Sequence, residues 1–383
     1  MPHRGLQAGT DVTYYLRHYF DPDMNHLALK PKVSDGESDV YNLGYVQNVI
    51  KDQVVAEIVP FEQAGPNPDE RFILKEPVFP LGPNTHLDPE NSRYLKSDIN
   101  GYVFYLDGKI TVKHVLNVRS DVSFQTGNIF FVGDMAVHGS VRAGFQAQAN
   151  AVRVMGMVEG GRVRSRGDML VEAGARGSAG GKGRLIAGGK IVCPFVEKLE
   201  VRAGDAIVID KYCLYSTLYV GTNLVVKGSL YGSTVNAYGS VYVGAQLGNR
   251  AAVPTKIYLG YSPQTIRELE KLDAYIANVS QRVTHLSAIA GHLPPETPNG
   301  QRLQRARNER QALLERRDEL WSHLYVDEER MQNCRLIVPG IVYPGVEVSI
   351  GKAYMLVERQ FENVCFRLSQ EDIIVVPNTA AGA

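Results

Sequence analysis

The stretch Gly204-Asp205-Ala206-Ile207-Val208-Ile209 shows a pattern that occurs seven times in the chain. Each time a turn-like dipeptide opens a short run in which apolar residues alternate. The dipeptides follow one another at steps of 16, 18, 22, 15, 17 and 18 residues. They are Gly133-Asp134, Ala149-Asn150, Gly167-Asp168, Gly189-Lys190, Gly204-Asp205, Gly221-Thr222 and Gly239-Ser240. A steady period with short strands is typical of a solenoid, in which each coil covers its neighbour's apolar face.

We therefore predict a mainly β protein with a parallel β-helix over residues 100–260. The glycines of the dipeptides are expected to supply backbone corners with positive φ. A hairpin is expected just before the first coil, because Asp107-Gly108 separates the alternating runs 101–106 and 109–112.

The chain has 383 residues and a formal net charge of zero, so its overall charge favours neither nucleic acid nor a membrane surface. The charge is unevenly distributed, however. Residues 1–100 carry 15 acidic and 9 basic side chains, whereas residues 141–190 carry 3 acidic and 9 basic ones. The basic segment is expected to attract an anionic partner or the acidic N-terminal region.

The four cysteines show neither a CxxC nor a Cys/His ligand pattern, which favours buried free thiols in a reducing compartment. They are Cys193, Cys213, Cys334 and Cys365. No apolar run reaches the roughly 18 residues that a membrane span needs, and no apolar signal region follows the N-terminus. We expect a soluble, cytoplasmic protein.

The first 99 residues are predicted to form a small α+β or irregular region. Val46, Val49 and Ile50 have helical spacing, whereas the run 54–59 is typical of a strand.

Between residues 262 and 333 the apolar period changes to heptads, which predicts an inserted antiparallel coiled-coil hairpin. The breaker 291–300 separates two helices. Period-2 alternation returns over 334–377, so the chain re-enters the β-helix there, and 378–383 is expected to be a disordered tail. The seam residues expected to mediate self-association are Leu269, Leu272, Ile276, Val279, Val283, Leu286, Arg310, Leu313, Arg317 and Leu320. Arg310 and Arg317 either extend to the edge of the seam or face acidic residues of another subunit.

The Gly-Asp dipeptides would stack Asp134, Asp168 and Asp205 in one column of a parallel β-helix. Such a column is compatible with calcium or carbohydrate chemistry. Asn150, Lys190, Thr222 and Ser240 share the same column, however, and the nonapeptide of calcium β-rolls is absent. Turn formation is therefore the favoured interpretation, and no metal site is predicted.

A basic cluster is the principal candidate for partner binding. It comprises Arg162, Arg164, Arg166, Arg176, Lys182 and Arg184. The first three alternate along one strand and point outward, either as a solvated face or as a docking surface for an acidic protein, an anionic polymer or the N-terminal region. Few aromatic residues interleave with it, which argues against single-stranded nucleic acid. The nearby glycine-rich stretch 174–183 does not match a phosphate-binding loop.

No catalytic set is present in the sequence. HExxH, GxSxG and a Cys-His pair near a nucleophile are all absent, and the six-residue repeat of left-handed acyltransferases is not kept. We predict neither catalytic residues nor a cofactor.

Three blocks of the chain resemble the flagellar assembly protein A family. The first runs from Asp121 to Asp134 and on through 138–145. The second combines 180–183 with 187–191, and the third is Tyr343-Pro344-Gly345 after the helical hairpin. The resemblance covers about residues 95–375. It implies a right-handed parallel β-helix with a helical hairpin, a cytoplasmic location, no enzymatic activity and a role in polar flagellum assembly.

The leading functional hypothesis is a non-enzymatic scaffold that forms a homo-oligomer and binds other proteins, including flagellar-pole components. A competing hypothesis is a polysaccharide-binding or polysaccharide-active β-helix. A third is a bactofilin-like polymer built by end-to-end stacking of β-helices.

Overall fold

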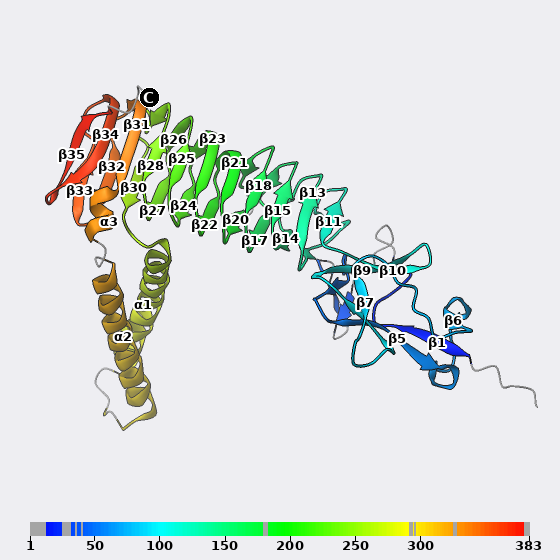
Figure 1. Cartoon of the computed structure of the whole chain (residues 1–383). Helices are drawn as coiled ribbons and strands as arrows, with labels where there is room; N and C mark the ends of the chain where they lie inside the picture. The colour runs from blue at the N-terminus through cyan, green and yellow to red at the C-terminus, as the bar shows by residue number, and fades with distance from the viewer. Residues whose placement is uncertain are drawn as a thin grey trace, which may run out of the picture. The chain divides into compact units, whose positions relative to one another are not determined.

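The computed structural model describes residues 13–24, 32–34, 37–39, 41–178, 183–290, 294, 296–324 and 328–378. The chain is mainly β and 19% helical, with a solenoid of about eight turns (Figure 1). It divides into two compact units, Met1–Ala173 and Gly174–Ala383.

The first unit begins with two antiparallel sheets. The five-stranded sheet has the order β6-β1-β5-β8-β7, and the three-stranded sheet has the order β10-β9-β4. Their strands are β1 (Tyr14–His18), β4 (Asn48–Val49), β5 (Val54–Pro60), β6 (Ile73–Leu74), β7 (Thr85–Leu87), β8 (Tyr94–Ser97), β9 (Gly101–Leu106) and β10 (Lys109–Lys113). A separate ribbon joins β2 (Lys32–Ser34) to β3 (Glu37–Asp39). The expected hairpin forms between β9 and β10, with Asp107 and Gly108 at φ 52° and 72°.

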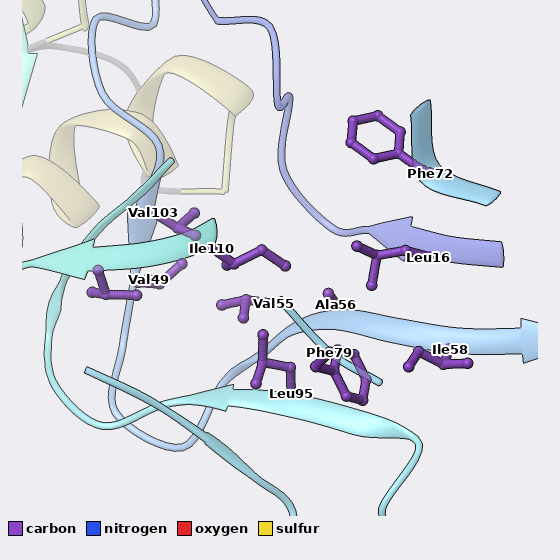
Figure 2. Packing of buried hydrophobic residues seen from close by; sticks show 11 residues of the cluster. Leu16, Val49, Val55, Ala56, Ile58, Phe72, Phe79, Leu95, Val103 and Ile110 are labelled. Atoms are coloured by element: carbon purple, nitrogen blue, oxygen red, sulfur yellow. The ribbon is translucent and has the colours of Figure 1, made fainter. Parts of the chain in front are cut away.

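The two sheets share one hydrophobic core. Leu16 of β1, Val55 and Ile58 of β5 and Leu95 of β8 pack with Ile110 of β10 (Figure 2). The short η2 turn (Glu70–Phe72) adds Phe72, and its N-terminus is capped by the Asp69 side chain, which accepts a hydrogen bond from the Arg71 amide.

The prediction of an α+β region at the N-terminus is wrong for the described residues, where β-strands are joined by two 3₁₀ turns, η1 (Phe61–Gln63) and η2. The expected helix around Val46–Ile50 is replaced by irregular chain and β4. Asn48 explains part of this difference. Its side-chain amide nitrogen donates to the Phe130 carbonyl at 2.7 Å, and its side-chain oxygen accepts from the Val132 backbone amide at 3.0 Å. These two hydrogen bonds tie the segment to the backbone of the solenoid's first coil.

Parallel ladders begin after this region. In the first unit one ladder is formed by β11 (Val115–Val118), β13 (Asp134–Val137), β15 (Val152–Val154) and β18 (Met169–Val171). A second is formed by β12 (Ile129–Phe130), β14 (Gln146–Ala149) and β17 (Arg162–Ser165). Single bridges from Val122 to Val141 and from Val141 to β16 (Val158–Glu159) form a third face.

The second unit continues the same plan. One ladder runs through β21 (Ile191–Glu197), β23 (Ile207–Leu214), β25 (Leu224–Val226), β28 (Val241–Val243) and β31 (Arg335–Val342). Three short strands extend this ladder: β19 (Ala175–Arg176) pairs with β21, β26 (Ser229–Tyr231) pairs with β23, and β29 (Gln246–Leu247) pairs with β26 and β31. The opposite ladder runs through β20 (Arg184–Ala187), β22 (Glu200–Ala203), β24 (Thr217–Val220), β27 (Thr234–Ala237), β30 (Thr255–Leu259) and β32 (Val346–Ile350).

Parallel register aligns identical positions of successive coils, so each inward column is continuous. One column is Leu185, Val201, Leu218, Val235, Ile257 and Val348, all fully buried. Burying one such side chain contributes about 1.5–3 kcal/mol, so this column is a main source of the unit's stability.

Five of the seven dipeptides lie between strands, and the other two lie at strand ends, with Asp134 opening β13 and Ala149 ending β14. Their glycines act differently from the expectation. Gly204 and Gly221 do not have positive φ. A Cβ at Gly221 would lie 1.9 Å from the Gly204 carbonyl oxygen, and one at Gly204 would lie 2.1 Å from that of Gly188. Glycine is needed there because the stacked turns touch backbone to backbone.

The positive-φ corners form a different column. Gly127, Gly144 and Gly160 occupy it in the first unit, and Lys198, Tyr215, Gly232 and Gly248 occupy corners with the same spacing in the second. Because Lys198 and Tyr215 are not glycine, this period is not visible in the glycine pattern alone.

Two long helices leave the solenoid between β30 and β31, where other coils have a turn of two or three residues. They are α1 (Pro263–Ala290) and α2 (Pro298–His323), which pack side by side, and α3 (Glu328–Asn333) leads back to β31 (Figure 1). Thr297 caps α2 by accepting a hydrogen bond from the Gly300 amide.

Antiparallel strands close the C-terminal end of the solenoid. β33 (Ala353–Leu356) pairs with β32, and β34 (Phe361–Ser369) pairs with both β31 and β35 (Asp372–Pro377). The expected tail covers residues 378–383, of which 379–383 lie outside the described residues. Asn378 is buried, and its backbone amide donates a hydrogen bond to the Asn363 carbonyl.

His18 makes the first unit sensitive to acid. Its ring packs edge-on against Phe72 with centroids 4.4 Å apart, and Nε2 is buried with no hydrogen-bond partner. Burial lowers the pKa of His18 to about 4, outweighing the attraction of Asp23. Between about pH 6.5 and pH 4 the His18 ring is protonated in the unfolded chain but neutral in the folded chain. The free energy of unfolding of the first unit therefore decreases as the pH falls through this range.

We expect amide exchange in β1 and β5 to accelerate over that pH window relative to intrinsic exchange, and His18→Phe to remove most of the acceleration. The exposed His138 provides the matched control, His138→Phe. An unchanged pH profile in His18→Phe would show that another group is responsible.

Candidate functional site

Three arginines, two on β17 and one directly after it, form an outward row in the first unit, here called the β17 row. Arg162, Arg164 and Arg166 are exposed and alternate with the buried Val163 and Ser165. Alternate residues of a strand stand about 6.6 Å apart, so the row is a regular line of positive charge. Within the described part of the chain none of the three makes an ion pair.

Neighbouring arginines of the same unit are neutralised. Arg142 bridges Asp121 and Glu159, and Arg153 pairs with Glu172 at 2.5 Å. The β17 row therefore has unpaired charge available for an anionic partner.

The other members of the predicted basic cluster are in a different situation. Arg176 pairs with Glu197 at 2.8 Å, and Arg184 pairs with Glu200 at 3.1 Å, both within the second unit. Glu197 raises the pKa of Arg176, mainly by charge attraction. Lys182 lies outside the described residues. The charges of Arg176 and Arg184 are therefore compensated by glutamates of the same unit, and the β17 row remains the candidate surface for an anionic partner.

The predicted seam lies between the two long helices. Val279, Val283 and Ala290 of α1 bury against Leu303 and Ala306 of α2. Leu286 and Leu313 pack against this cluster. Half-buried positions complete the seam, namely Leu272, Ile276, Arg310, Arg317 and Leu320. The chain's own second helix thus covers the middle of the seam, and the half-buried positions are the ones left with area for another molecule.

Polar contacts also hold the helices together. Glu309 of α2 accepts a hydrogen bond from the Tyr275 hydroxyl at 2.6 Å and pairs with Arg282 of α1. Arg317 pairs with the adjacent Asp318 at 3.1 Å. Heptad spacing does not reveal Glu309, because its partners lie outside the apolar seam.

A second polar cluster joins α1 to the solenoid. The buried Tyr219 of β24 donates to a Glu270 carboxylate oxygen of α1 at 2.5 Å. Arg202 and Arg267 lie over its ring, with guanidinium carbons 5.8 and 5.9 Å from the centroid. Burial and then the hydrogen bond to Glu270 raise the pKa of Tyr219, whereas burial and the charge of Arg202 lower that of Arg267.

The turn residues build turns, as the favoured interpretation expects. Asp134 accepts from the Asn150 side chain at 2.7 Å, and Asp205 accepts from the Thr222 hydroxyl at 2.8 Å. In the described residues no group of three or more His, Cys, Asp or Glu side chains is placed to hold a metal ion.

The four cysteines carry free thiols in the fold. Burial raises the pKa of both Cys193 and Cys213 to about 12, so both remain protonated and unreactive at neutral pH. Among the described helices, none combines the length and the apolar character required to cross a bilayer.

Comparison with protein-family models gives a match over most of the solenoid. The model of the flagellar assembly protein A β-solenoid domain matches residues 114–373. No curated protein and no solved structure matches the chain.

The Tyr219–Glu270 bond is expected to hold the first turns of α1 on the solenoid. Tyr219→Phe removes a buried hydrogen bond to a carboxylate, a loss of about 1.5–3 kcal/mol. Amide exchange should therefore quicken in residues 263–272 and stay unchanged in β22 and β27. Tyr242→Phe, on the opposite ladder, is the control. Equal exchange in both variants would mean that the bond contributes nothing to the attachment.

Proposed function

Because the chain belongs to the flagellar assembly protein A family, we propose that it is a non-enzymatic, cytoplasmic scaffold for flagellar assembly that acts by binding other proteins and by self-association. The observation that carries the proposal is the family match, which spans 260 of the 383 residues (114–373). Two structural features support it: a solenoid with buried inward columns, and a pair of long helices that leaves it between β30 and β31.

The helical pair is the proposed self-association element. Its middle section is a small core, but the half-buried Leu272 and Ile276 of α1 and Leu320 of α2 still expose apolar area. Tyr275, three positions after Leu272 on α1, is also exposed. Apolar groups repeated along one helical pair form a self-complementary surface of the kind that symmetric dimers use.

The row of arginines on β17 is the proposed docking surface for an acidic partner. Its charge is not compensated within the described part of the chain, and strand alternation directs the three side chains to the same outward side. End-to-end polymerisation is less well supported, because β33, β34 and β35 close one end of the solenoid with antiparallel strands.

We expect the intact chain to be a defined oligomer by light scattering and to become a monomer when residues 264–331 are replaced by a short Gly/Ser linker. Leu272→Asp with Ile276→Asp should have the same effect, because the paired charges cannot be buried between subunits. Leu170→Asp, an exposed apolar position on β18, is the control and should leave the mass unchanged. The same mass for the deletion variant and the intact chain would refute self-association through the helices.

For the β17 row, we expect retention on an immobilised acidic polypeptide such as polyglutamate, with elution as salt rises through the range where charge is screened. Replacing Arg162, Arg164 and Arg166 with Gln should abolish retention. The control replaces three exposed arginines of α2 with Gln, namely Arg302, Arg305 and Arg307. Equal retention of both triple variants would assign the binding to another surface.

A further inference from the structure

A cavity of about 500 Å³ opens where the helices meet the solenoid in the second unit. Its floor comes from β27, β30 and β32, and its walls come from the solenoid-proximal ends of α1 and α2 and from residues 351–354. Cavities that hold small organic ligands have volumes of about 300–1,000 Å³, so this one is of the size that a small molecule occupies.

One outward column of the ladder forms the floor. Parallel register places Asn236 of β27 beside Tyr258 of β30 and Tyr258 beside Ser349 of β32, and the antiparallel pairing of β33 adds Tyr354. All four residues line the cavity. At about 4.8 Å for each ladder step, the column is about 14 Å long. It alternates a polar group with an aromatic ring, which suits a ligand that has both polar groups and apolar ring faces.

Asn236 is the unusual member of this column. It is only 2% exposed, yet its side-chain nitrogen Nδ2 has no hydrogen-bond partner. Buried donors in folded proteins are normally paired. A ligand oxygen in the cavity would supply the missing acceptor, whereas a purely apolar ligand would leave this donor unpaired.

Charged groups of both signs surround the cavity. Glu270 and Asp273 of α1 line it together with Lys352, which follows β32. Glu270 also accepts the Tyr219 hydroxyl, and two arginines lie over that tyrosine ring. Because carboxylates and cations stand together, the cavity selects neither a strongly basic nor a strongly acidic ligand. The same groups can accept hydrogen bonds from neutral hydroxyls and donate hydrogen bonds to them.

Aromatic rings line the rim and the floor. Trp321 is 43% exposed and Tyr354 is 59% exposed, and the half-buried Tyr258 lies on the floor. The face of an aromatic ring carries partial negative charge, so it attracts the weakly positive C–H groups on the face of a sugar ring.

We propose that this cavity binds a neutral saccharide. A sugar ring lies with its C–H face against the aromatic rings. One of its hydroxyl oxygens accepts the hydrogen bond from Asn236, and other hydroxyls donate to the carboxylates of Glu270 and Asp273. The inference goes beyond the proposed scaffold function and does not depend on it.

A nucleoside is the competing ligand, because bases also stack on aromatic rings. The hydrogen-bonding groups of a base lie along the edges of a flat ring. The polar groups of this cavity come instead from the floor, from the helical wall and from the segment after β32, so they surround a ligand on several sides. The hydroxyls of a sugar also point to several sides, which favours the sugar.

Trp321 is the only tryptophan of the chain, so its fluorescence in the full chain reports on this cavity. The neutral probes are maltose, cellobiose and N-acetylglucosamine. Glucosamine and glucuronic acid add one positive and one negative charge to a sugar ring, and adenosine represents the nucleosides. We expect a saturable change with at least one neutral saccharide. Binding of both charged sugars and of adenosine should be at least about fivefold weaker, because a charge without a net opposite charge in the cavity loses its hydration.

Two variants test the residues. Tyr354→Ala should weaken binding of the best neutral saccharide about fivefold, and Asn236→Leu should weaken it about fivefold or more. Tyr242→Ala, which removes an exposed tyrosine from the opposite ladder, is the matched control and should leave binding unchanged. Because Asn236 is buried, circular dichroism checks the folding of that variant, and the exposed Tyr354 keeps the test valid if Asn236→Leu fails to fold.

The proposal is overturned if none of the neutral saccharides changes the fluorescence, or if a charged sugar or adenosine binds as tightly as the best of them. It is equally overturned if Tyr354→Ala binds that saccharide as the intact chain does. These outcomes are separate from the oligomer mass and from polyglutamate retention, so the cavity can fail while the scaffold function stands, and the reverse.

Discussion

The structure depends on the direct backbone contact between the turns of successive coils. At Gly221 a side chain would begin 1.9 Å from the carbonyl oxygen of Gly204, a distance that no Cβ atom tolerates. The same crowding recurs at Gly204 against Gly188. Strands on both sides of these turns can pair at the usual spacing of about 4.8 Å only because the turns approach this closely. The buried columns and the outward rows of side chains both follow from that spacing.

The parallel solenoid was predictable because its two signals are local: alternating apolar residues and a recurring small-residue turn. The all-β character of the described part of the N-terminal region was not. Val46, Val49 and Ile50 fit a helix by spacing alone, but spacing does not show that the Asn48 amide binds Phe130 and Val132, more than 80 positions away. The positive-φ corner was missed for a related reason, since Lys198 and Tyr215 interrupt its glycine period.

For the candidate surfaces too, some features could be predicted from the sequence and others could not. The outward direction of Arg162, Arg164 and Arg166 follows from strand alternation and is confirmed by their exposure. That Arg176 and Arg184 are neutralised could not be foreseen, because their glutamates lie one coil further along the chain. Tyr219 and Glu270 are separated by 51 positions and by a change from strand to helix. Contacts of this kind need the register between coils and the placement of the helix, which no motif in one segment encodes.

The helices leave the solenoid at a single corner, in the place of a turn of two or three residues, and this has a mechanical consequence. A force on the far end of the helical pair reaches the solenoid as a torque on that corner. The groups that resist it include the Tyr219–Glu270 hydrogen bond with its two flanking arginines, the hydrogen bond from the Tyr261 hydroxyl to the Gly351 carbonyl, and Arg330 over the Tyr238 ring. The helical pair is thus a lever about 40 Å long by its helical rise, attached at one corner of the solenoid.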